Sequence, residues 1–379
     1  MSTITDSPTT PSPKRPYAPQ PKVQMAIGCI FIPVVLALVV IGGLFYLRSK
    51  ASSSFVVPAG DVALVRTMPD ESAPLMARFG PGRTLEITGR TEAWDWVQVR
   101  LWDGRTGWTL RPLDILVWRL DAPITQPVAP EVEPPAIVPI AAEMLPIPAT
   151  SFTMGSPPGL GETDEQPAHP VSLSAFEIDR TEVTVGQYWQ CIEAGECAPP
   201  TSDASTTEVN YLNDPAYDNY PMVNIPWTEA NNYCHWRGQR LPTEAEWEVA
   251  AGWDIDKQAK YLWPWGSDPA AAKANVGETS VGQAAPVGTF PEDISPAGLL
   301  DMGGNVSEWV FDWYKADYYR IADDTDPIGP SQRRGEGIGR VVRGGSFSDP
   351  VDEARTANRR NQVEDYGNPT VGFRCASDG

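Results

Sequence analysis

Few side chains of this protein are suited to acid–base catalysis or to binding a redox metal. The sequence contains two histidines, His169 and His235, so a site with three histidine ligands cannot be built from this chain alone. We expect His169 to form a structural hydrogen bond and His235 to be packed. No serine, histidine and aspartate form a recognisable hydrolase triad. Gly159 and Gly161 lack the Gly-Lys-Ser/Thr of a phosphate loop.

The five cysteines are the other reactive residues. Cys29 lies in a long apolar run. The other four form an even-numbered set that allows three pairings: Cys191, Cys197, Cys234 and Cys375. If the apolar run anchors the chain, these four would lie in an oxidising compartment, where disulfides persist. Four reduced thiols in a cytosolic protein are the alternative.

The composition limits the classes of partner. With 49 acidic and 29 basic residues the formal net charge is −20, so nucleic-acid phosphates would be repelled. We therefore expect no nucleic-acid partner. The 379 residues leave room for two or three domains.

An uncharged run at residues 23–47 is long enough to span a bilayer with some tilt. It is longer than the apolar core of a signal peptide and has no evident cleavage site. We expect a retained transmembrane helix, preceded by a disordered cytoplasmic tail at 1–22. The protein would then be a single-pass cell-membrane protein whose later domains are extracytoplasmic.

Residues 55–120 contain short strand-like runs separated by turns, among which Asp103 and Gly104 predict a hairpin. The segment resembles a bacterial SH3-like domain, a small all-β barrel. This resemblance implies a cell-wall or protein partner, and a simple spacer is the alternative. The proline-rich stretch at 121–146 is typical of a semi-rigid linker.

Residues 147–379 show few helix signals and many loops. Thr184 with Gln187, and Thr243 with Glu246, are spaced as capping boxes at the start of two helices. Thr228 is expected to cap a third helix.

Several longer motifs carry a family resemblance. They are FTMGS (152–156), TEVTVGQY (181–188), RLPTEAEWE (240–248), DMGGNVSEW (301–309), RGGSF (343–347) and GFRC (372–375). These motifs and their order along residues 147–377 resemble those of the formylglycine-generating enzyme, or sulfatase-modifying factor, family. The resemblance implies an α+β, C-type-lectin-like fold with little regular secondary structure. The whole chain would add the SH3-like barrel and one transmembrane helix.

The same resemblance implies a disulfide between Cys234 and Cys375, which leaves Cys191 to pair with Cys197. It also implies a structural calcium ion, with Asp301, Gly304, Val306 and Glu308 as the ligands. Two carboxylates and two backbone carbonyls suit this hard cation. A second calcium site would use the side chain of Asn275 and the carbonyl of Val276.

The family's catalytic residues are missing. Active members carry two cysteines just after the Gly-Gly-Ser turn, and these bind copper and activate oxygen to oxidise a substrate cysteine. Residues 347–360 contain no cysteine, and Asp349 lies near the first of the two positions. A carboxylate cannot replace a thiolate as a soft copper ligand. We therefore expect neither copper nor iron.

The sequence thus leans toward a ligand- or partner-binding module without formylglycine-generating activity. Its groove would be formed around Ser346, Phe347, Asp349 and Arg359. The alternatives are an oxidoreductase-type maturation enzyme of the same family with altered chemistry, and a purely structural component of the cell envelope.

Overall fold

The computed structural model describes residues 54–58, 62–80, 82–93, 95–110, 142–200, 202, 205, 210–280, 282–330 and 339–379. The predicted tail at 1–22, the predicted membrane span at 23–47 and most of the predicted linker lie outside these residues. Within the described ranges, no helix is both long and apolar enough to cross a membrane. The chain divides into the units Met1–Ser52 and Ser53–Gly379, and all described residues belong to the second.

The first described region is an antiparallel sheet of six strands in the order β1-β4-β5-β6-β2-β3. The strands are β1 (Ser54–Val56), β2 (Ala63–Arg66), β3 (Leu75–Phe79), β4 (Thr84–Arg90), β5 (Trp96–Arg100) and β6 (Thr106–Leu110). Strands β5 and β6 form the hairpin predicted from Asp103 and Gly104, and Gly104 has a φ of +85° that suits glycine. The predicted β-structure is confirmed over these strands. The SH3-like identity stays a prediction.

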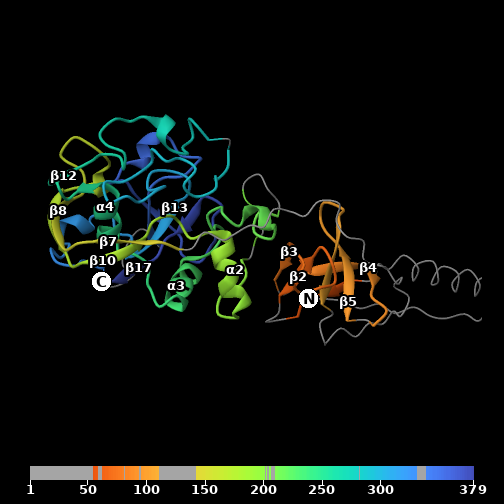
Figure 1. Cartoon of the computed structure of the whole chain (residues 1–379). Helices are drawn as coiled ribbons and strands as arrows, with labels where there is room; N and C mark the ends of the chain where they lie inside the picture. The colour runs from red at the N-terminus through yellow and green to blue at the C-terminus, as the bar shows by residue number, and fades with distance from the viewer. Residues whose placement is uncertain are drawn as a thin grey trace, which may run out of the picture. The chain divides into compact units, whose positions relative to one another are not determined.

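From residue 142 onward, the described strands form four small sheets joined by long loops (Figure 1). The sheet orders are β17-β10-β7, β8-β9, β11-β12 and β15-β14-β13-β16. The strands are β7 (Met144–Ile147), β8 (Thr150–Met154), β9 (His169–Leu173), β10 (Phe176–Asp179), β11 (Trp253–Asp254), β12 (Ala259–Lys260), β13 (Ser307–Trp313), β14 (Arg340–Arg343), β15 (Arg359–Gln362), β16 (Val371–Phe373) and β17 (Ala376–Asp378). Short strands and abundant loops match the predicted α+β fold with little regular secondary structure.

The domain begins earlier than the sequence predicts, because β7 starts at Met144, inside the expected linker. Strand β7 is the edge of its sheet and pairs with β10, where Pro146 lies opposite Glu177. Proline lacks a backbone N–H but is tolerated on an edge strand. The proline content of the segment therefore does not prevent strand pairing.

Three α-helices are described in this domain: α2 (Val185–Glu193), α3 (Trp227–Trp236) and α4 (Glu244–Gly252). Both predicted capping boxes are confirmed, with Thr184 and Gln187 at the start of α2 and Thr243 and Glu246 at the start of α4. Helix α4 packs against β8 and β13 (Figure 1).

The prediction that Thr228 caps α3 is wrong. The N-cap is Pro226, and no side chain caps the helix. The indole Nε1 of Trp227 instead donates to the carbonyl of Val310 at 2.7 Å. Because this contact fixes the first helical residue to β13, tertiary packing sets the start of α3.

Both predicted disulfides are present in the structure. Cys191 pairs with Cys197, and Cys234 at the end of α3 pairs with Cys375 between β16 and β17. These cysteines belong to one large buried apolar cluster. A second cluster contains Trp247 and lies around α4.

Arg340, the first residue of β14, packs between two indole rings. Its guanidinium carbon lies 3.6 Å from the ring centroid of Trp227 and 3.7 Å from that of Trp313. The same group donates to the carboxylate of Glu364 at 3.2 Å and to the carbonyl of Phe311 at 2.6 Å.

We expect Arg340→Lys to lower the free energy of unfolding by about 1–2 kcal/mol, because an ammonium group lacks the flat face and the forked donors of a guanidinium. Urea denaturation would measure the change. Arg320→Lys, at an exposed arginine, is the control and should have little effect. Equal stability of the two variants would contradict this role for Arg340.

Candidate functional site

The Gly-Gly-Ser turn between β14 and the following loop is tightly constrained. Gly344 and Gly345 have φ values of +90° and +70°. A Cβ atom on Gly345 would lie 3.0 Å from the backbone of Glu353. The hydroxyl of Ser346 donates to the carboxylate of Asp349 at 2.6 Å. The turn therefore holds Asp349 in a fixed place.

Asp349 lies in an ion pair rather than in an open site. Arg360 donates to both of its oxygens, at 2.9 and 3.0 Å, and also contacts the hydroxyl of Ser307. The position near which the resemblance places the first catalytic cysteine is thus occupied by a carboxylate already neutralised by an arginine.

The groove predicted around Ser346, Phe347, Asp349 and Arg359 is not formed by these four residues. Ser346, Phe347 and Arg359 are buried, and only Asp349 is partly exposed. Arg359 donates to the carboxylate of Glu244 on α4 at 2.7 and 2.8 Å. It therefore holds the domain together instead of facing a ligand. The arginine that reaches Asp349 is its neighbour Arg360.

Side chains of the RLPTEAEWE motif on α4 contact the arginine of the RGGSF motif. Glu244 and Glu248 are four residues apart and lie on one face of α4, where both accept hydrogen bonds from Arg343, at 3.2 and 2.5 Å. Arg343 also donates to the carbonyls of Thr356 and Ala357. This buried network ties α4 to β14 and to the loop that precedes β15.

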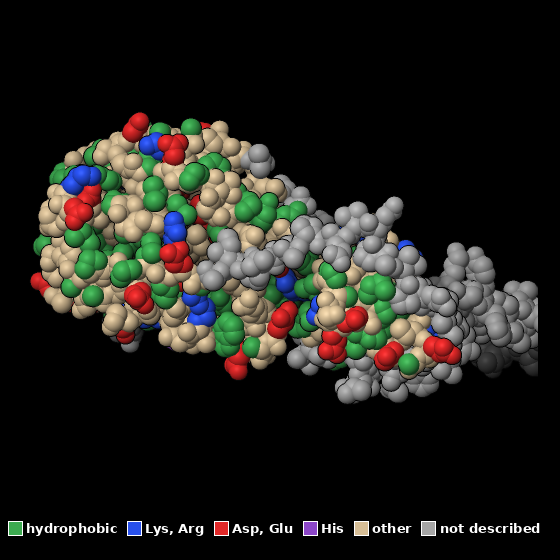
Figure 2. Space-filling view, in the orientation of Figure 1, with side chains coloured by type: hydrophobic (Ala, Val, Ile, Leu, Met, Phe, Trp, Pro, Cys, Tyr) green, Lys and Arg blue, Asp and Glu red, His purple; other side chains and the backbone are tan. Residues whose placement is uncertain are grey.

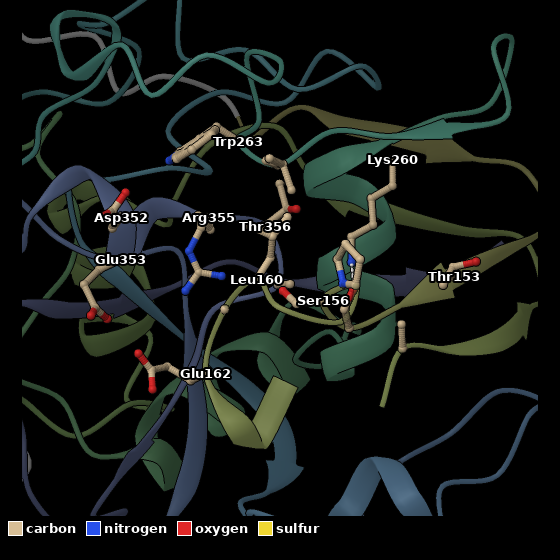
Figure 3. Close-up of a pocket in the computed structure, with 16 residues that line it drawn as sticks. Thr153, Ser156, Leu160, Glu162, Lys260, Trp263, Asp352, Glu353, Arg355 and Thr356 are labelled. Atoms are coloured by element: carbon tan, nitrogen blue, oxygen red, sulfur yellow. Dashed lines mark hydrogen bonds between the residues drawn. The ribbon is translucent and has the colours of Figure 1, made fainter. Parts of the chain in front are cut away.

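A pocket lies beside that loop, and we call it the Trp263 pocket (Figure 3). Its volume is about 480 Å³. Three segments far apart in the sequence line it: residues 153–168, which begin in β8, residues 260–263, which begin at the end of β12, and residues 352–357. Its apolar lining comes from Pro157, Leu160, Ala168, Leu262, Trp263 and Ala357. The third segment begins three residues after Asp349.

Both basic side chains of the Trp263 pocket are already paired. Lys260 donates to the carboxylate of Glu248 and to the carbonyl of Gly155, and burial lowers its pKa. Arg355 donates to both oxygens of Glu165 at 2.7 and 2.8 Å. Burial opposes ionisation of Glu165, but the hydrogen bonds from Arg355 and Ser156 outweigh it and hold its pKa below the ordinary value.

Three further carboxylates line the same pocket: Glu162, Asp352 and Glu353. Figure 3 shows them on one side of the pocket, with Lys260 and Thr153 on the other. None of these lining residues is among the site residues that the sequence predicts. The available signal was the acidic pair Asp352 and Glu353, just after the Gly-Gly-Ser turn.

The predicted calcium ligands lie in a strained turn. Asp301 has a φ of +57°, and a Cβ atom on Gly304 would lie 2.7 Å from the carbonyl oxygen of Asn275. Asp301 accepts a hydrogen bond from the amide of Gly288 at 2.6 Å. Glu308 accepts two hydrogen bonds from Arg374, at 2.7 and 2.8 Å, and one from Trp247. Glu308 thus has one of its four acceptor sites left.

Buried carboxylates are in excess around this turn. One oxygen of Glu182 and one of Asp293 are buried without a hydrogen-bond partner. Burial, and then the charge of Asp301, raise the pKa of both groups well above the ordinary value. Burial also raises the pKa of Asp301 itself to about 6. Such a group of buried acids fits a bound cation, which would neutralise it.

No three acidic, histidine or cysteine side chains converge on a metal-binding point in the described part of the chain. The first predicted calcium site needs only two carboxylates with two carbonyls, so it stays a prediction. The second predicted site also stays a prediction. The carbonyl of Val276 already accepts from the amides of Thr279 and Ser280, at 2.9 and 2.8 Å. The side-chain nitrogen of Asn275 donates to Asn305, so its side-chain oxygen is the atom that would bind a cation.

Neither histidine lies in a catalytic arrangement. His169 contacts the carbonyl of Pro167 at 3.1 Å and packs against Tyr319, as a structural residue would. The prediction that His235 is packed is wrong, because its side chain is exposed near the end of α3 and contacts Asn231. Near this end of α3, the buried side chains are instead those of Tyr233 and Cys234.

Residues 130–379 match the model of the sulfatase-modifying factor enzyme 1-like domain. A formylglycine-generating enzyme of Thermomonospora curvata is 32% identical over 295 residues, covering 63% of this chain and 94% of that protein. A solved structure of PvdO from Pseudomonas aeruginosa shares 29% identity with a TM-score of 0.50, covering 63% of this chain and 95% of that one.

A serine/threonine-protein kinase pkn1 of Chlamydia pneumoniae is 35% identical over 272 residues, or 67% of this chain. The chain spans 41% of the length of that relative.

Proposed function

We propose that this chain, which belongs to the family with the sulfatase-modifying factor enzyme 1-like domain, does not carry out the copper-dependent cysteine oxidation of that family. The chain would be anchored in the cell membrane by residues 23–47 and would bind a ligand in the extracytoplasmic Trp263 pocket. The kinase activity named for the chlamydial relative is not part of this proposal, since the chain matches less than half of that protein.

The state of the cysteines carries this proposal. Of the five cysteines in the sequence, four are joined in two disulfides within the domain, and the fifth is Cys29. The family reaction needs two thiolates just after the Gly-Gly-Ser turn, and residues 347–360 supply none. Soft thiolate ligands are what bind copper(I). Asp349 is instead held by Arg360.

The Trp263 pocket supports the binding part of the proposal. It combines apolar walls with a few polar groups and lies beside the segment that follows the Gly-Gly-Ser turn, as a ligand pocket would. The positions of the basic residues do not favour nucleic acid: on the face shown in Figure 2, they lie next to acidic ones. Calcium bound at Asp301 and Glu308 would play a structural part.

We expect elemental analysis by mass spectrometry of the purified full-length protein to find about one or two calcium ions per chain, with copper and iron far below one. The matched control is Asp301→Asn with Glu308→Gln, which removes both proposed carboxylate ligands and should lower the calcium content. One copper or iron per chain would refute the proposal and favour the alternative, a maturation enzyme with altered chemistry. Calcium retained by the double variant would show that the cation binds at another site.

A further inference from the structure

We propose that the ligand of the Trp263 pocket is a cation with an apolar body, an amine or guanidine attached to a short aliphatic or aromatic group. This inference rests on the proposed binding function and adds the chemical class of the ligand. It follows from the charges that remain in the pocket once its internal ion pairs are accounted for.

The two cations of the pocket are not free to bind an anion. Lys260 is held by Glu248, and Arg355 is held by both oxygens of Glu165. Glu165 and Glu248 are fully buried, so separating either pair would leave a buried charge without a partner. An anionic ligand would have to compete with these pairs.

Among the residues that the structure describes, no basic side chain lies at hydrogen-bonding distance from these three carboxylates. Arg360 comes within 4.0 Å of Glu353 but is already shared between Asp349 and Ser307. The hydrogen bonds to Glu165 raise the pKa of Arg355, and the charges of Asp352 and Glu353 add to this effect. Arg355 therefore interacts electrostatically with Asp352 and Glu353 without a hydrogen bond to either. Glu162 and Asp352 are exposed and Glu353 is partly exposed, so all three are open to a positively charged ligand.

The walls select for an apolar body next to the charge. The indole Nε1 of Trp263 donates to the carbonyl of Val351 at 2.9 Å, which fixes the ring in the wall of the pocket. An aromatic face attracts a nearby cation and packs against an aliphatic stem. A small inorganic cation would leave the contacts with Leu160, Leu262 and Trp263 unused.

Isothermal titration calorimetry on the full-length protein in detergent tests the proposal. The cationic probes are capped lysine (Nα-acetyl-lysine methylamide) and n-hexylamine, which distinguish a basic peptide side chain from a free amine. The neutral probe is the same capped lysine acetylated at Nε, and the anionic probe is capped glutamate. We expect a cationic probe to bind, and its affinity to fall as ionic strength rises.

The variants Glu162→Gln, Asp352→Asn and Glu353→Gln should each weaken binding by about threefold to tenfold, the usual range for a partly solvated charge pair. Glu177→Gln, at an exposed acid on β10, is the matched control and should change nothing. Thr153→Trp, at an exposed position of β8 that lines the pocket, should block binding by steric filling without disturbing the core.

The outcomes separate the two claims. Equal or tighter binding of the neutral or anionic probe, blocked by Thr153→Trp, would overturn the cation preference and leave the binding function standing. Cation binding that Thr153→Trp does not affect would place the site elsewhere and overturn the inference. No binding by any probe would overturn both claims.

Discussion

Replacing Arg343 with leucine is expected to lower the free energy of unfolding of the C-terminal domain by about 3–5 kcal/mol, the cost of removing one partner from a buried ion pair. Arg343 is 1% exposed and donates to Glu244 and Glu248 of α4. Without it, part of the negative charge on Glu248 would be buried with only Lys260 and a backbone amide as partners.

Urea denaturation followed by tryptophan fluorescence would measure the loss. The matched control is Arg180→Leu, because Arg180 pairs with Glu143 at the surface and both side chains are about half exposed. That pair should contribute less than about 1 kcal/mol. Similar losses for the two variants would contradict a special role for the buried network.

The same change is expected to weaken ligand binding in the Trp263 pocket. Arg343 donates to the carbonyls of Thr356 and Ala357, and both of these residues line the pocket. Their release would let the pocket wall move. Titration of Arg343→Leu with the cationic probes, under conditions where it stays folded, would detect this, and unchanged affinity would contradict the coupling.

Removing the disulfide between Cys234 and Cys375 is expected to have the second large effect. The bridge spans 141 residues, and in the chain-entropy model a loop of that length contributes about 5 kcal/mol. The bridge between Cys191 and Cys197 spans 6 residues and should contribute only about 2 kcal/mol.

The comparison needs two double variants, Cys234→Ala with Cys375→Ala, and Cys191→Ala with Cys197→Ala. Each removes two buried sulfur atoms, so the packing losses are similar and the difference reports mainly on loop closure. Denaturation of both without reductant should show the long-range variant to be less stable by about 2–3 kcal/mol. Equal losses would show that loop entropy does not dominate here.

Local features of the fold could be predicted where the determining contacts are close in sequence. Thr184 with Gln187 and Thr243 with Glu246 cap their helices because a capping box involves only four residues. The hairpin at Asp103 and Gly104 is equally local. The start of α3 was missed because a distant residue, Val310, anchors Trp227.

The candidate site was predicted only in part. The absence of the catalytic cysteines can be read directly from residues 347–360, and the paired cysteines followed from the family resemblance. No groove opens at Ser346 and Phe347 because both are covered by other parts of the chain. No local pattern records which part of a loop remains exposed once the chain has folded.

The sequence by itself determined that residues 347–360 contain no cysteine, the family to which the chain belongs, and the local helix and hairpin signals. The tertiary structure decided which charged residues face one another. Arg359 and Arg360 are neighbours on β15, where successive side chains point to opposite faces. Pairing of β15 with β14 directs Arg359 to Glu244 and Arg360 to Asp349. The Trp263 pocket likewise forms only where three segments that are distant in the sequence meet. Strand register and long-range contacts of this kind are set by packing in the folded chain.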